Sequence, residues 1–243
     1  MKKIELEVSK EKGSLPEPEV SKQVIKPKKM PVTALFKGNY LKISLLLTVL
    51  WVTQTVGYFG YSSWAPTLLF KQGITIEKSL IYVAVATLGA PLGSYIAVLI
   101  SDRFERKWSL TITGVTIAIS GLLYGLTFNP VFIIIFGLLV NMFERVFTAL
   151  AYAYSPELFP TEVRAIGSGV PYGIGRLSNL IGPIIISYIF THSGYQSVFY
   201  FIASTWLIGA VVIGFFGPRT KKRRIEESNI DGFENNTQSL VVK

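Results

Sequence analysis

Six runs of about 20 mostly apolar residues, joined by short polar connections, constrain this sequence more than any other feature. A helix rises about 1.5 Å per residue, so each run can cross the hydrocarbon core of a bilayer, roughly 30 Å thick. Only 16% of the residues are charged, whereas a soluble domain carries roughly 25%. The sequence therefore predicts an all-α integral membrane protein. The expected transmembrane helices are residues 40–62, 79–100, 108–128, 131–155, 165–190 and 195–217.

Positive charge lies at both ends of the chain and in alternate connections between the spans. Ten lysines fall in residues 1–42, and the loop arginines fall in residues 101–107 and 156–164. The remaining connections carry only Lys71 and Lys78. Because lysine and arginine collect on the cytoplasmic side, this pattern predicts a multi-pass protein of the cell membrane with both termini in the cytoplasm.

The two ends of the chain differ in composition from the spans between them. Residues 1–39 mix lysine and glutamate with four prolines, so they predict a flexible, basic cytoplasmic segment. Residues 40–217 are expected to form a six-helix transmembrane bundle, and residues 218–243 a cytoplasmic tail. The net charge of +9 follows from this topology, so we expect the cations to meet the lipid bilayer and not a nucleic acid.

Residue patterns typical of enzymes and metal sites are absent from the sequence. Without cysteine, the chain has neither disulfides nor thiolate metal ligands. It also lacks a paired-histidine motif and a Gly-x-Ser-x-Gly elbow, and its glycine-rich stretch GSGVPYGIG has no phosphate-loop lysine. We therefore expect no enzyme activity, no metal ion and no cofactor.

Polar residues recur at helical spacing inside three of the expected spans. In the fourth span their spacing places them on one face, which consists of Asn141, Glu144, Arg145, Thr148 and Tyr152. The other two stripes are Ser168, Tyr172, Arg176 and Asn179 in the fifth span, and Gln54, Tyr58, Tyr61 and Ser62 in the first. Glu144 and Arg176 lie about 20 and 17 Å from the starts of their spans, near the middle of the membrane.

Three full charges at this depth have two open interpretations. A charge at the bilayer centre costs on the order of 3 kcal/mol, so Glu144, Arg145 and Arg176 should face one another or a hydrated cavity. They form either a structural ion pair, Glu144 with one of the arginines, or a functional site. The charge balance favours the second, because one carboxylate cannot neutralise two arginines. The additional anion would be a substrate carboxylate or an acidic residue of a partner.

Four stretches carry motifs that are recognisable together: YSPELFPTEVRAIGSGVPYGIGRLSNLIGPII (154–185), GYSSWAPTLLF (60–70), SDRFERK (101–107) and GPRTKKRRIEE (217–227). The first contains the pattern Glu-x-x-Pro-Thr-x-x-Arg. In this order they resemble the major facilitator superfamily, over about residues 40–225. The similarity points to its sugar-porter-like branch and to its organic-anion and aromatic-acid–proton symporter branches.

This resemblance implies a fold and a partner. The superfamily has twelve spans in two six-helix halves, so the chain looks like a C-terminal half, with residues 1–39 corresponding to the linker between halves. Its partner would be an N-terminal six-helix half or, in a homodimer, a second copy of this chain. Whether the chain is a fragment, a split subunit or a half-size homodimer stays open.

The resemblance also implies a substrate site at the midplane, exposed to each side in turn as the halves rock. Glu144 would carry a coupled proton, and the planar guanidinium of Arg176 would hold an anionic group of a small organic solute. Arg145 would either pair with Glu144 or join the same site. The residues expected to bind substrate are Arg176, Gln54, Tyr58, Asn141, Arg145, Tyr172 and Asn179.

A second group of charges lies in the connections expected on the cytoplasmic side. The resemblance implies an ion-pair network that holds an inward gate shut, made of Asp102, Arg103, Arg106, Glu157 and Arg164. The positive-inside rule alone would account for the arginines, although not for the two acids. Val98 and Glu105 depart from the loop motif, since glycine is usual at both positions.

Taken together, these features favour a secondary active transporter of a small organic anion, coupled to protons. Two alternatives stay open: a non-transporting membrane fragment or assembly subunit, and a sugar transporter. Sugar porters typically carry paired glutamines in the helix that corresponds to the first span, where only Gln54 is present. This difference argues against a sugar.

Overall fold

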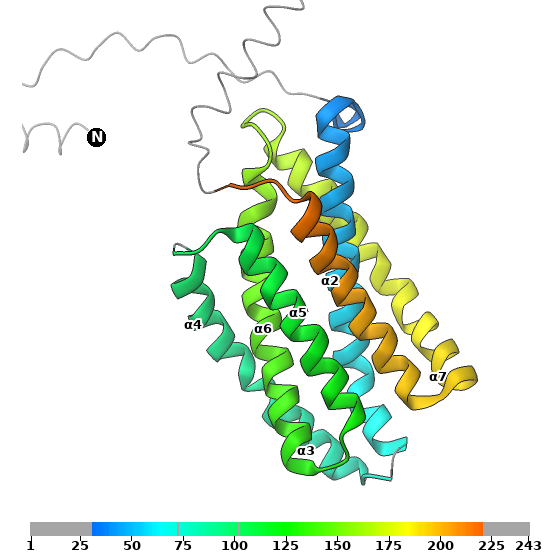
Figure 1. The fold of residues 1–243 in the computed structure, drawn as a ribbon. Helices are drawn as coiled ribbons and strands as arrows, with labels where there is room; N and C mark the ends of the chain where they lie inside the picture. The colour runs from blue at the N-terminus through cyan, green and yellow to red at the C-terminus, as the bar shows by residue number, and fades with distance from the viewer. Residues whose placement is uncertain (1–30, 72, 102, 221–243) are drawn as a thin grey trace, which may run out of the picture.

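The computed structural model describes residues 31–71, 73–101 and 103–220, and every regular element within them is a helix. The expectations for residues 1–30 and 221–243, and for the gate residue Asp102, lie outside this described part of the chain. The all-α prediction is confirmed (Figure 1). The elements are the 3-10 helix η1 (Val32–Phe36) and the α-helices α2 (Gly38–Lys71), α3 (Ile76–Thr87), α4 (Gly89–Ser101), α5 (Arg106–Leu126), α6 (Pro130–Glu157) and α7 (Arg164–Phe216).

Five helical stretches are long and apolar enough to cross a membrane: α2, α3 with α4, α5, α6 and α7. The longest, α7, has 53 residues and folds back at Gly194, where φ is 80° and ψ is −177°. Glycine adopts this positive φ without the penalty of a Cβ atom. The two arms of α7 run in opposite directions (Figure 1), so the bundle has six spans, as predicted. The expected connection between the fifth and sixth spans, residues 191–194, contracts to this single non-helical residue.

Two helix boundaries differ from the sequence-based expectation. The first span was expected to end near residue 62, but α2 continues to Lys71 through Pro66, because Ala65 and Leu68 remain buried against the bundle. The second span was expected to be continuous, but it breaks between α3 and α4 at Leu88. Pro91 accounts for this break, because it has no N–H to offer the carbonyl of Thr87, four residues earlier.

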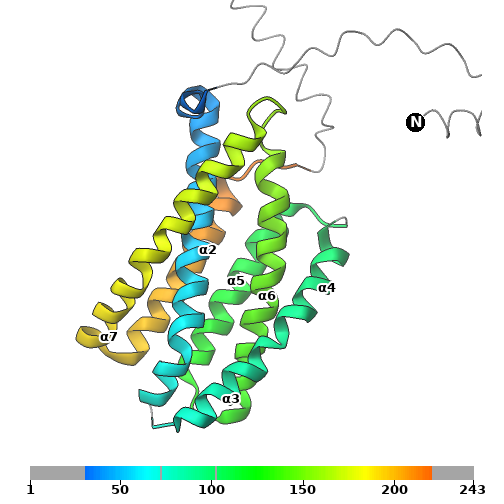
Figure 2. The same ribbon diagram turned by 180° about the vertical axis from the view of Figure 1, so that it is seen from behind.

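The helices pack so that one long face of the bundle contains α2, α6 and the first arm of α7. Figure 2 shows α2 between that arm and α6, while α5 lies behind them. α2 packs mainly along α7, and α6 packs against α3, α4 and α5. Glycines permit the closest approaches: a Cβ atom on Gly175 would lie 2.6 Å from the Cβ atom of Trp51. This contact brings the middle of α7 directly onto α2.

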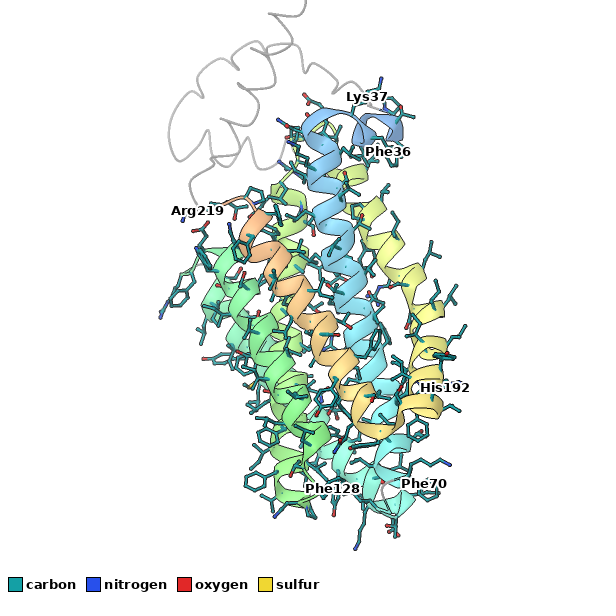
Figure 3. All side chains as sticks on the ribbon, turned by 45° about the vertical axis from the view of Figure 1, so that its right-hand side comes forward. Phe36, Lys37, Phe70, Phe128, His192 and Arg219 are labelled. Carbon is teal, nitrogen blue, oxygen red and sulfur yellow. The ribbon has the colours of Figure 1, made fainter. Side chains whose placement is uncertain are left out.

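Both described chain ends lie at the same end of the bundle. Figure 3 shows Lys37 and Arg219 at one end, and Phe70, Phe128 and His192 at the other. An even number of spans requires this arrangement. It leaves the connection that contains Arg103, and the one between α6 and α7, at the end that carries Lys37 and Arg219 (Figure 1).

Candidate functional site

Glu144 is buried in the bundle, with one carboxylate oxygen bound by neutral side chains. Only 2% of the residue is exposed. Its Oε1 accepts hydrogen bonds from Thr148 Oγ1 at 2.7 Å and from Gln54 Nε2 at 3.1 Å. Thr55 in turn donates to Gln54 Oε1 at 3.3 Å. These bonds connect the midpoints of α2 and α6 and fix the orientation of the carboxylate.

The other carboxylate oxygen of Glu144 lies beside a cation. Its Oε2 has no hydrogen-bond partner among the described residues, and Arg145 Nε lies 3.8 Å away. The Arg145 side chain is 46% exposed and interacts with the hydroxyl of Tyr58 on α2. Arg176 is near enough to interact electrostatically with the same carboxylate. The structure thus brings the three intramembrane charges into one electrostatic group.

Arg176 lies on the exposed face of the first arm of α7, held by aromatic side chains. Its Nε donates to Tyr172 Oη at 2.8 Å, and its Nη2 donates to Tyr152 Oη at 3.5 Å. The guanidinium carbon lies 4.9 Å from the ring centre of Tyr172 and 5.7 Å from that of Phe59. The other guanidinium N–H groups have no partner in the described part of the chain. They are available to an anion, which a guanidinium can bind with two parallel bonds.

Trp51, a residue of α2, packs against both tyrosines, Tyr152 of α6 and Tyr172 of α7. Its ring centre lies 4.9 Å from each of the rings of Tyr152 and Tyr172, and its Nε1 donates to Ser155 Oγ at 3.2 Å. Tyr152 also donates to the hydroxyl of Tyr172 at 3.1 Å. Side chains of α2, α6 and α7 therefore meet at this point and position Arg176.

The remaining residues expected to bind substrate are placed less favourably. Asn141 is buried and donates to the carbonyl of Gly137, one turn earlier on its own helix, at 2.8 Å. Asn179 is half-buried and makes no side-chain hydrogen bond to the described residues. Gln54 is engaged by Glu144 and Thr148. Arg145, Tyr58, Arg176 and Tyr172 thus remain the best-placed expected contacts.

Several residues of this site were not identified from the sequence. Thr148 and Tyr152 lie on the predicted stripe of the fourth span, but no role followed from their positions. Trp51, Phe59 and Thr55 belong to the first span, and the spacing of Trp51 before Gln54 and Thr55 puts them on one helix face. That spacing could have indicated that Trp51 belongs to the site. It did not distinguish this role from the usual one of an aromatic residue in a helix, which is to pack in the core.

Two of the residues expected to form the cytoplasmic gate make an ion pair with each other in the described part of the chain. Arg106, the first residue of α5, forms a salt bridge with Glu157, the last residue of α6, and also donates to Ala153 O at 3.4 Å. Arg164 does not join this pair; it donates to the carbonyl of Phe159 at 3.4 Å. The pair links the ends of two spans.

The segment after α7 is attached next to this ion pair. Tyr154 donates to the carbonyl of Pro218 at 2.9 Å, and Arg219 Nε lies 3.9 Å from Glu105 Oε2. Glu105 stands where the motif usually has glycine, so its carboxylate gives the arginine a partner. These contacts hold the residues that follow the last span against α5 and α6.

The fold and the position of the charges define a polytopic α-helical membrane protein with a polar, charged group inside its spans. A family model described as "Major Facilitator Superfamily" matches residues 81–241. The chain belongs to the major facilitator superfamily. The resemblance inferred from the motifs is thereby confirmed, and with it the expectation that the chain is not an enzyme.

Two relatives indicate how much of a superfamily protein this chain represents. It is 45% identical over 226 residues to YyaJ of Bacillus subtilis (strain 168), whose name assigns it to metabolite transport; the match covers 92% of this chain and 50% of the relative. It is 29% identical over 208 residues to the niacin transporter NiaP of Acinetobacter baylyi, covering 85% of this chain and 47% of the relative. The chain therefore spans about half the length of the curated relatives that it matches.

Solved structures show the same fold. The proton:xylose symporter XylE bound to 6-bromo-6-deoxy-D-glucose superposes with a TM-score of 0.64 at 18% identity, over 77% of this chain and 42% of that one. The similarity covers less than half of the symporter, which agrees with six spans out of a larger bundle. It supports the fold alone.

Proposed function

We propose that this chain forms the C-terminal half of a secondary transporter that moves a small organic anion together with a proton. The observation that carries the proposal is Arg176. It presents a full positive charge with free N–H groups on an exposed face inside the membrane-spanning part, framed by Tyr152 and Tyr172. Ionisable residues in such positions commonly mark the path of a substrate or an ion. A carboxylate is the ligand that fits a partly free guanidinium.

Glu144 is the proposed proton carrier. It is the acid among the three intramembrane charges, and it lies beside Arg145 and within electrostatic reach of Arg176. A carboxyl group that gains and loses a proton there changes the charge next to the substrate. That change gives the protein a physical means to couple proton and anion binding.

The second half is proposed to complete the site. The face that presents Arg176 would then meet an N-terminal six-helix half or a second copy of this chain, with the substrate between them. The end that carries Lys37 and Arg219 is proposed to be cytoplasmic, because the lysines and arginines outside the spans concentrate there. The Arg106–Glu157 pair would then contribute to an inward gate.

A small carboxylate fits the described residues better than a sugar. Sugar binding relies on amide and hydroxyl side chains that are free to exchange hydrogen bonds, but Gln54 already binds Glu144 and Thr148. One relative is named as a niacin transporter, and niacin is a pyridine carboxylate. Niacin is therefore the first probe to test.

The test is uptake of labelled niacin, benzoate, acetate and xylose by liposomes that contain the purified assembly of which this chain is part. We expect uptake of at least one carboxylate, accelerated by an inward proton gradient, and no uptake of xylose. Arg176→Lys should lose most carboxylate uptake, because an ammonium group lacks the planar fork. Wild-type assemblies that move none of these solutes would favour the non-transporting alternative.

A further inference from the structure

Two cations from different segments lie close together where α5 begins and α7 ends. The two helices touch there, because a Cβ atom on Gly214 of α7 would lie 3.2 Å from Thr111 Cγ2 of α5. Thr111 also donates to the carbonyl of Lys107, one turn earlier, at 3.0 Å. Since α5 and the second arm of α7 run in opposite directions (Figure 1), Lys107 lies beside the residues that follow Gly214. Those residues lead to Arg219, whose Nε lies 3.9 Å from Oε2 of Glu105, two residues before Lys107.

Neighbouring side chains hold both cations at the surface of the bundle. Arg219 follows Pro218, whose carbonyl accepts a hydrogen bond from the buried Tyr154 at 2.9 Å. Lys107 Nζ lies 5.5 Å from the ring centre of Trp108, and an aromatic face attracts an ammonium group. Arg219 is exposed and Lys107 is half-buried, so both charges remain within reach of a ligand.

The charges at this junction do not balance. Arg106 is compensated by Glu157, with which it forms a salt bridge. Arg219 has the carboxylate of Glu105 beside it, whereas Lys107 has no acidic partner within 4 Å among the described residues. Glu105, Lys107 and Arg219 together therefore carry one positive charge. A phosphodiester group, which carries one negative charge, would neutralise it.

An exposed apolar surface extends from the two cations toward the middle of the spans. Two of its residues lie one turn apart on α5 and two lie one turn apart on α7. This apolar strip consists of Trp108, Ile112, Val211 and Phe215. Tryptophan and basic residues gather at the level of lipid headgroups, while aliphatic side chains meet the acyl chains. The opposite ends of the same helices lack this pattern, because residues 120–135 and 193–200 contain no lysine or arginine.

We propose that the junction of α5 and the second arm of α7 is a binding site for an anionic phospholipid such as phosphatidylglycerol. The phosphate lies between Lys107 and Arg219, and an acyl chain lies along the apolar strip. The strip favours a lipid over a soluble phosphate, because a free phosphate leaves these side chains without a partner. The bound lipid fastens the residues that follow α7 to the start of α5. This inference goes beyond the proposed function and does not depend on the transported solute.

The experiment is quenching of Trp108 fluorescence by brominated lipids in liposomes that contain the purified assembly of which this chain is part. Bromine quenches a tryptophan that it contacts, and Trp108→Phe gives the background from all other tryptophans. At the same low mole fraction, brominated phosphatidylglycerol should quench Trp108 more than brominated phosphatidylcholine does. A basic residue near the membrane surface changes the affinity for an anionic lipid by about fivefold, so Lys107→Gln and Arg219→Gln should each lower the preference by about that factor.

Three further variants test the charge balance. Lys37→Gln is the matched control, because it removes a cation at the same end of the bundle but away from this junction, and it should leave the preference unchanged (Figure 3). Glu105→Gln should strengthen the preference for phosphatidylglycerol, since it removes the acid beside Arg219. Lys107→Arg keeps the charge and should keep the preference. A loss of preference in Lys107→Arg would contradict recognition by charge.

Other outcomes would overturn the inference. Equal quenching of wild type by the two brominated lipids would show that the strip meets bulk lipid without selecting an anionic one. A preference that survives in Lys107→Gln and Arg219→Gln but disappears when residues 221–224 (KKRR) are changed to glutamine would assign the binding to that basic run. Displacement of brominated phosphatidylglycerol by excess glycerol 3-phosphate would show a site for a soluble phosphate. None of these measurements requires transport, so they stand apart from the test of the proposed function.

Discussion

The guanidinium of Arg106 at the start of α5 is paired with the carboxylate of Glu157 at the end of α6. The two residues lie at the end of the bundle that carries Arg219, and they join the ends of two separate spans. Neither side chain is fully buried, with 20% and 38% exposed. A partly exposed pair adds little to folding, so its value would lie in favouring one arrangement of the helix ends over another.

Replacing Arg106 or Glu157 by alanine should shift the balance between inward- and outward-open states without preventing insertion. A pair of this exposure is worth at most about 1 kcal/mol, which corresponds to a shift of about fivefold in the two populations. Spin labels at this end of the assembly would report the populations. The charge-swapped pair Arg106→Glu with Glu157→Arg should restore the balance. Populations that stay unchanged in both alanine variants would contradict a gating role.

Tyr154→Phe should loosen the residues that follow α7. The tyrosine is fully buried and its hydroxyl donates to Pro218 O, so the change removes one hydrogen bond and leaves the ring in place. A lost hydrogen bond of this kind costs about 1 kcal/mol, so trypsin cleavage at Arg219 should accelerate by about fivefold. Tyr40→Phe is the matched control, because the Tyr40 hydroxyl makes no hydrogen bond to the described residues. Equal cleavage rates in both variants would show that the hydrogen bond from Tyr154 to Pro218 does not restrain the residues after α7.

Gly175→Ala should destabilise the bundle, while Gly173→Ala should not. A Cβ atom at Gly175 would lie 2.6 Å from Trp51 Cβ and 2.9 Å from Trp51 C, whereas nothing lies within 4 Å of one at Gly173. Gly175→Ala forces α7 away from α2 and should lower the free energy of unfolding by about 1–3 kcal/mol. Gly173→Ala, at an exposed position, should change it by roughly 0.5 kcal/mol or less. Thermal unfolding in detergent compares the two. Trp51 packs against Tyr172, so Gly175→Ala should weaken substrate binding as well as stability. Gly173→Ala should change neither.

Much of the fold was predictable, because the bilayer fixes the length and polarity of each span. The six spans follow from apolar runs, and the superfamily follows from motifs in the connections. The break at Leu88 and the extension of α2 past Pro66 were not evident, because one proline interrupts a helix and the other does not. Packing distinguishes them: Pro66 lies among buried residues that hold α2 together, while the second span is the least buried of the five stretches.

The candidate site was predictable only in part. Helical spacing placed Glu144, Arg145 and Arg176 inside the membrane on polar stripes, since charges in apolar runs are conspicuous. Spacing along one helix cannot reveal contacts between helices, and so it did not show that Gln54 binds Glu144. Nor did it show the aromatic support of Arg176 by Trp51, because tryptophan in a membrane span is ordinary. Sequence patterns therefore located the charges, and only the packing of α2 against α6 and α7 gave their partners.

The orientation of the bundle can be tested at two residues that lie at opposite ends, Lys37 and His192 (Figure 3). The chain has no cysteine, so Lys37→Cys and His192→Cys each introduce a single reactive thiol. We propose that the end with Lys37 is cytoplasmic, because the lysines and arginines outside the spans concentrate there. A membrane-impermeant maleimide should then label His192→Cys in intact cells and label Lys37→Cys only after the cells are opened. Both side chains are exposed, so lack of labelling would reflect the side of the membrane and not burial. Labelling of Lys37→Cys from outside would reverse the proposed orientation, and with it the assignment of the Arg106–Glu157 pair to an inward gate.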